Sequence, residues 1–91
     1  MSLYDVHLVC RTALRDEAFR EALNNDPAAA LQGFDLSPSE HRALLAGDVG
    51  ELYAEGAHEY VLMWLGRAQV LGLDIPEFMK RITAAEPHYV F

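Results

Sequence analysis

The sequence has little cysteine, little basic charge and no long hydrophobic run. Among its 91 residues, one is cysteine and seven are Lys or Arg, against 14 Asp or Glu, so the formal net charge is −7. Nucleic-acid binding depends on clustered cations, and the basic residues here are scattered, so we expect no nucleic-acid partner. A secreted domain of this size usually contains several disulfides, so the single cysteine favours the reducing cytoplasm.

No segment has the hydrophobicity that a membrane requires. The longest uninterrupted apolar run covers residues 60–65, whereas a helix that spans a bilayer needs about 20 such residues. No basic region is followed by a long apolar run, so we expect neither a signal peptide nor a membrane partner. Apolar residues nevertheless make up 52% of the chain, which excludes disorder, and the length fits a single domain over residues 1–91.

Proline and glycine are few, and they occur where helices would begin or end. Residues 3–14 have apolar side chains at helical spacing, and no alternating pattern is long enough for a strand. We therefore expect an all-α fold, a small orthogonal bundle of about five helices. The predicted helical segments are 3–14, a helix capped by Asp16, a turn at 28–31, and then 38–46, 48–55, 58–71 and a last helix after Asp74.

The strongest local signal marks the start of the segment 38–46. Ser37 has the side chain of an N-cap, Pro38 occupies the first helical position, and Glu40 completes a capping box. Gly47 follows the last helical residue, where a left-handed conformation commonly ends a helix. Further N-caps are predicted at Asp16, Asp26, Asp48 and Asp74.

The four histidines do not form a metal-binding motif. A zinc or iron site needs three or four converging ligands, often two histidines on one helical face, and no pair among His7, His41, His58 and His88 has that spacing. We therefore assign no metal site. His58, near a helix start after Gly56, is the histidine with the best functional prospects, and a hydrogen-bonded structural role is favoured over a ligand role.

The sequence also gives no reason to assign a catalytic residue. Cys10 lies three residues after His7, but it belongs to the apolar face of the segment 3–14, so we expect a buried core thiol rather than a nucleophile. Paired carboxylates are common, yet acid–base catalysis needs a desolvated cleft that separates their pKa values. A bundle of this size has little room for one.

The apolar run 60–65 is the most informative feature. Six consecutive apolar residues surround a helix completely, because one turn holds 3.6 residues. Either other helices surround this one, or one side of it faces a partner chain; both can hold at once. The candidate interface or pocket-lining residues are His58, Tyr60, Met63, Trp64 and, from the C-terminal segment, Tyr89 and Phe91.

The stretch 34–58 carries a family pattern: a phenylalanine, then L-S-x-x-E-x-x-A-L-x-x-x-D, a short helix, a glycine and an apolar helix. The residues that match are Phe34, Leu36, Ser37, Glu40, Ala43, Leu44, Asp48, Leu52 and Gly56. In this the chain resembles the LigA family, the small (alpha) subunits of class II extradiol ring-cleavage dioxygenases such as protocatechuate 4,5-dioxygenase. The resemblance extends over about residues 19–73.

The resemblance implies a role without an active site. In that family the non-haem iron(II), its histidine and glutamate ligands and the catalytic base belong to the large (beta) subunit. The alpha subunit is a helical cap that packs on the beta subunit and helps close the pocket over the aromatic substrate. The resemblance thus implies no cofactor in this chain, a beta-type partner that holds iron(II), and a part in the catabolism of aromatic compounds.

Other readings of the residues remain open. The chain can be a stand-alone helical interaction domain or a homodimer that associates through residues 60–65. It can be a small enzyme or ligand-binding module that uses His58 with Glu59 and Tyr60. Residues 19–27 are also similar to the helical leaders of modified-peptide precursors, although residues 83–91 lack the cysteine- or serine-rich core of such a precursor.

Overall fold

The computed structural model describes residues 2–84, which form seven α-helices, one 3₁₀ turn and no strand. The all-α prediction is confirmed, but "about five helices" is too few, because the short segments predicted at 28–31 and 48–55 each correspond to a separate helix, α3 and α5. In chain order the elements are α1 (Ser2–Arg15), α2 (Glu17–Asn25), α3 (Pro27–Ala30), η1 (Leu31–Gly33), α4 (Pro38–Ala46), α5 (Val49–Ala54), α6 (Glu59–Ala68) and α7 (Ile75–Ala84).

The predicted caps are present. At α4, the Ser37 side chain accepts a hydrogen bond from the Glu40 N–H at 3.2 Å, and the Glu40 carboxylate accepts one from the Ser37 N–H at 2.9 Å. Each N-cap of this kind contributes about 1 kcal/mol to helix stability. The same role is filled by the predicted aspartates, Asp16, Asp26, Asp48 and Asp74.

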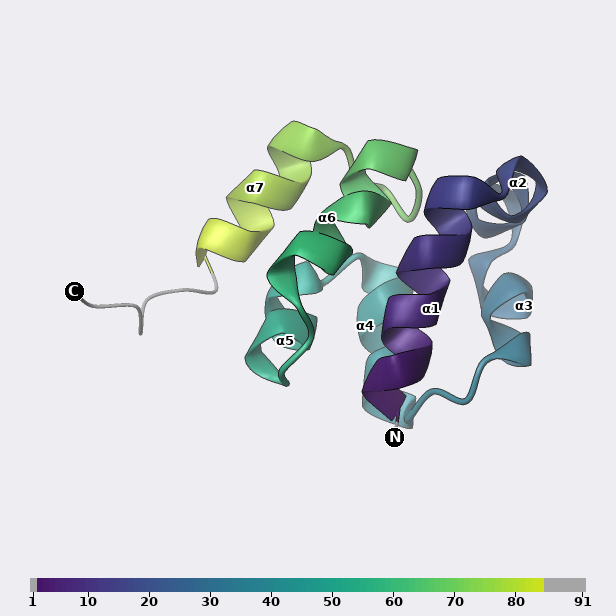
Figure 1. Cartoon of the computed structure of the whole chain (residues 1–91), viewed down its shortest axis with the longest axis horizontal. Helices are drawn as coiled ribbons and strands as arrows, with labels where there is room; N and C mark the ends of the chain where they lie inside the picture. Colours follow the sequence, from purple (N-terminus) through teal and green to yellow (C-terminus); the bar gives the residue numbers. More distant parts are fainter. Residues whose placement is uncertain (1, 85–91) are drawn as a thin grey trace.

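Helices α1 and α6 form the centre of the molecule (Figure 1). They lie side by side and run in the same direction, so this central pair departs from the orthogonal arrangement predicted from the sequence. Helix α7 lies on the other side of α6, and α2 and α3 lie beyond α1. Helices α4 and α5 lie behind the central pair in this view.

The core is formed by one stripe of α1 and the inner side of α6. Val6, Val9, Cys10 and Ala13 are fully buried, at the spacing of one helical face. From α6, Leu62 and Leu65 are fully buried, and α7 adds Phe78 and Ile82. Each large apolar side chain buried in this way contributes roughly 1.5–3 kcal/mol to folding.

Helix α6 ends earlier than the sequence predicts. The segment 58–71 was expected to be helical, but α6 stops at Ala68, and both Gln69 and Leu71 have a φ of 58°. The left-handed turn at Gln69 closes the helix and directs Val70, Leu71 and Leu73 into the core, where all three are buried. Burial of these side chains outweighs the modest cost of left-handed backbone at two non-glycine residues.

Two glycines permit close contacts with α7. A Cβ atom on Gly66 would lie 3.0 Å from the Asp74 carbonyl oxygen and 3.2 Å from the Phe78 Cβ, so α7 packs directly against the backbone of α6. Gly47 ends α4 with a φ of 67°. Its carbonyl oxygen and that of Ala46 accept hydrogen bonds from Arg81 of α7, at 2.9 and 3.2 Å.

Within residues 2–84, no helix combines the length and the hydrophobicity that crossing a bilayer requires.

Candidate functional site

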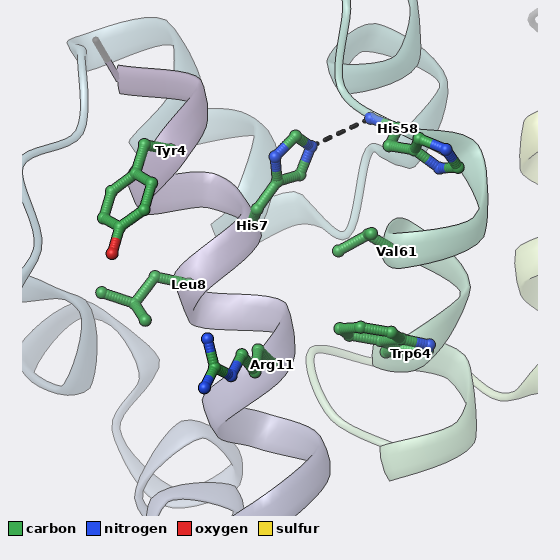
Figure 2. Close-up of a pocket in the computed structure, with 7 residues that line it drawn as sticks. All are labelled: Tyr4, His7, Leu8, Arg11, His58, Val61 and Trp64. Atoms are coloured by element: carbon green, nitrogen blue, oxygen red, sulfur yellow. Dashed lines mark hydrogen bonds between the residues drawn. The ribbon is translucent and has the colours of Figure 1, made fainter.

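The start of α6 is fixed by two histidines from distant parts of the chain. His58 is the N-cap of α6, and its Nδ1 accepts a hydrogen bond from the Tyr60 N–H at 3.1 Å. The His58 backbone N–H donates to Nε2 of His7, on α1, at 3.0 Å (Figure 2). The hydrogen-bonded structural role predicted for His58 is therefore confirmed, and its side chain is exposed at the same time.

This contact requires an uncharged His7. Nε2 can accept a hydrogen bond only in the neutral ring, with the proton on Nδ1. Partial burial lowers the pKa of His7 below its ordinary value of 6.5, and the nearby His58 lowers it further. Both effects favour the protonation state that the hydrogen bond to His58 needs.

A groove of about 290 Å³ lies between α1 and α6, and we call it the α1–α6 groove. Figure 2 shows Val61 and Trp64 extending from α6 toward α1, with Leu8 and Arg11 along α1. The α1 residues that line this groove have helical spacing and form a stripe along the helix. That stripe lies beside the stripe of α1 residues that faces the core. Its lining is Tyr4, His7, Leu8, Arg11, His58, Val61 and Trp64.

A second groove, of about 430 Å³, lies on the opposite side of α6, and we call it the α6–α7 groove. Tyr60 is 59% exposed and Met79 is 47% exposed, whereas Phe78 is buried. Large apolar side chains are thus accessible to another molecule here. The lining is His58, Glu59, Tyr60, Met63, Phe78 and Met79.

The run 60–65 is part core and part accessible surface, and its role toward a partner chain stays a prediction. Leu62 and Leu65 are fully buried, as a central helix requires, while Tyr60 is exposed and Met63 and Trp64 are half-buried. The candidate residues do not form one patch, because Tyr60 and Met63 line the α6–α7 groove and Trp64 lines the other. The predictions for Tyr89 and Phe91 fall outside the described residues.

The sequence-based reasoning missed the contribution of α1. Tyr4, Leu8 and Arg11 line the α1–α6 groove, and none of them was a candidate. Their spacing of four and three residues places them on one helical face. That spacing is a signal in the sequence, but it becomes meaningful only when the partner helix of that face is known.

The predicted core role of Cys10 is confirmed. The residue is 0% exposed, and burial raises the pKa of its thiol to about 12, so the thiolate is scarce at neutral pH. Among residues 2–84, no three His, Cys, Asp or Glu side chains come together in a way that could hold a metal ion. The donor set of this part of the chain therefore does not fit an iron site.

Comparison with known proteins identifies the family. No curated protein and no solved structure matches the chain significantly. The model of the family described as "Aromatic-ring-opening dioxygenase LigAB, LigA subunit" matches residues 10–86. This match covers most of the chain and includes both α6 and the motif at residues 34–58. The chain therefore belongs to the LigA family, the small subunits of aromatic-ring-opening dioxygenases.

Proposed function

We propose that this chain is a non-catalytic small subunit of an extradiol dioxygenase of the protocatechuate 4,5-dioxygenase type. It packs on an iron-bearing large subunit in the cytoplasm and helps close the substrate pocket of that subunit. The family match carries the proposal, and the accessible apolar side chains around α6 support it.

The α6–α7 groove has the features of a protein-binding surface. Tyr60 and Met79 line it and are exposed, and the buried Phe78 also contributes to its lining. Aromatic residues and methionine are enriched at the centres of protein interfaces. Covering these side chains with apolar surface of the large subunit removes them from water, at a gain of about 25 cal/mol per Å² before the costs of association.

The chain's contribution to catalysis is positional in this proposal. The described residues do not fit an iron site, so binding of the aromatic substrate to metal and the ring-opening chemistry are left to the large subunit. The side chains of this chain exclude water from the pocket mouth. Exclusion of water strengthens the electrostatic interactions inside a closed site.

Reconstitution tests the proposal. The chain and the large subunit of a class II extradiol dioxygenase from the same genome are purified separately, supplied with iron(II), and assayed with protocatechuate and gallate, alone and mixed. We expect a stable complex and a higher rate for the mixture than for either chain alone, because closure excludes water and completes the site. A large subunit that is equally active alone would contradict the proposal.

A matched pair of variants locates the surface. Tyr60→Ser combined with Met79→Ser removes the exposed apolar groups of the α6–α7 groove, and we expect complex formation to weaken by roughly 30-fold. Leu45→Ser changes an apolar residue of α4 that is exposed but lines neither groove, and it should leave binding unchanged. Equal effects of the two variants would argue against this surface.

Self-association through the same side chains is the competing function. The exposed Tyr60 and Met79 would be covered in a homodimer as well, although two chains of formal charge −7 repel each other. Sedimentation of the isolated chain distinguishes self-association from the small-subunit function. A tight dimer that does not bind the large subunit would favour a stand-alone interaction domain.

A further inference from the structure

The α1–α6 groove differs in composition from the rest of the surface. It is lined by Tyr4, Trp64 and Arg11, and Tyr, Trp and Arg are the residue types that most often dominate binding energy at protein interfaces. No carboxylate lines it, although the chain has 14 Asp and Glu against seven Lys and Arg. In an acidic chain, the lining of this groove thus has one permanently cationic side chain, Arg11, and no carboxylate.

The charge of Arg11 is not used within the described fold. Arg20 donates to the carbonyl oxygens of Ala13 and Leu14 at the end of α1, and Arg81 pairs with Glu77 and caps α4. By contrast, the exposed Arg11 makes no hydrogen bond or ion pair with any residue in the range 2–84. A guanidinium has five N–H donors in a planar fork that matches a carboxylate.

The surroundings of Arg11 are apolar. Leu8 lies between Tyr4 and Arg11 along α1, and Val61 and Trp64 extend from α6 toward α1 (Figure 2). A carboxylate that reaches Arg11 would sit beside these side chains, and a partner covering them would exclude water. Charge-assisted hydrogen bonds are stronger in such a setting than at an open surface, provided both groups find their partners.

The shape of the groove favours a protein segment as its occupant. Tyr4 is 68% exposed, so one wall is open to solvent. Pockets for small molecules bury most of the ligand's surface, and this open groove of about 290 Å³ covers an occupant from one side only. A segment of a larger protein brings its own cover for the other side. A second copy of the chain is disfavoured by repulsion between like net charges.

Resting on the proposed function, we propose that the α1–α6 groove receives an acidic side chain of the large subunit. Its carboxylate pairs with Arg11, and an apolar residue next to it packs against Trp64 and Tyr4. The groove thus sets the orientation of the small subunit on its partner, while the α6–α7 groove supplies apolar contact area on the other side of α6.

Trp64 provides a direct readout, because it is the single tryptophan of the chain. The chain is labelled with 5-fluorotryptophan and observed by ¹⁹F NMR while the unlabelled large subunit is added. We expect the single resonance to shift on binding.

Arg11→Glu should weaken binding by roughly 30-fold, the loss typical of a buried charge pair. Arg42→Glu makes the same change in net charge at an exposed site on α4 and should change binding less than about threefold.

The outcomes separate the two proposals. If the complex forms while the Trp64 resonance stays unchanged and Arg11→Glu binds like Arg42→Glu, the groove assignment is overturned and the proposed function stands. If no large subunit of this enzyme class binds, the proposed function fails and the assignment fails with it. A saturable shift with benzoate alone, or a shift that follows the chain's own concentration, would overturn the assignment in favour of a small ligand or a second copy.

Discussion

The two sides of α6 have the same hydrophobic character and opposite surroundings. Leu62 and Leu65 are fully buried against the neighbouring helices, while Tyr60 is 59% exposed and Met63 and Trp64 are half-buried at the grooves. Hydrophobicity alone therefore does not tell which side chains stabilise the fold and which are available to a partner. The difference is that the bundle covers the face with Leu62 and Leu65 and leaves the parts of the helix that line the two grooves accessible.

Truncation of the buried side should have the largest effect. Leu62→Ala removes a side chain that is 0% exposed, and the lost transfer energy and the resulting cavity should lower the free energy of unfolding by about 2–5 kcal/mol. Tyr60→Ser, on the exposed side, should change it by no more than about 0.5 kcal/mol. Urea unfolding followed by circular dichroism measures both. Similar losses for the two variants would mean that the two sides of α6 do not differ as described.

A smaller effect is expected where α6 meets α7. An alanine normally stabilises a helix relative to glycine by roughly 0.5–1 kcal/mol. At Gly66, however, the added Cβ would lie 3.0 Å from the Asp74 carbonyl oxygen. Overpacking of this kind costs about 1–3 kcal/mol, so Gly66→Ala should destabilise the protein. Gly33→Ala is the control, because no atom lies within 4 Å of its Cβ position. A Gly66→Ala variant with raised thermal stability would show that α7 can move away freely.

The smallest effect concerns pH and the contact between His7 and His58. Because the pKa of His7 is lowered in the folded state, the unfolded chain binds more protons in that range, and stability increases with pH there. The contribution is complete above pH 6.5, the ordinary pKa, and is lost as the pH falls through the lowered value. His7→Gln keeps an acceptor but does not titrate, so this part of the pH dependence should disappear.

His41→Gln serves as the control for that measurement, since His41 lies on α4 and lines neither groove. The free energy of unfolding is measured for the wild type and both variants at several pH values between about 5 and 8. This range spans the ordinary pKa of histidine. A wild-type slope that persists in His7→Gln would assign the proton uptake to another group.

The features that the sequence predicted well are local ones. The capping box at Ser37 and Glu40 and the four aspartate caps depend on residues three positions apart, so their geometry is set by the nearby chain alone. The end of α6 was wrong, because the left-handed turn at Gln69 is favoured by burial of Val70 and Leu73 against other helices. That energy depends on contacts between distant segments, which the local pattern does not contain.

The candidate site shows the same division. Tyr60, Met63 and Trp64 were identified from one apolar run, and His58 from its position near a helix start. All four line grooves. Tyr4 and Arg11 were missed because their role depends on α1 lying beside α6, 51 residues away at the contact of His7 with His58. A groove between two helices depends on both segments. Only the fold or the family resemblance shows that the two segments are neighbours.

The contact of Arg81 with the end of α4 has a consequence for synthesis of the protein. Its guanidinium reaches carbonyl oxygens 34 and 35 positions earlier in the chain. During translation those carbonyls stay without this donor until α7 has left the ribosome. Nascent chains that stop before residue 81 should therefore remain open to proteases, and resistance should appear abruptly once α7 emerges.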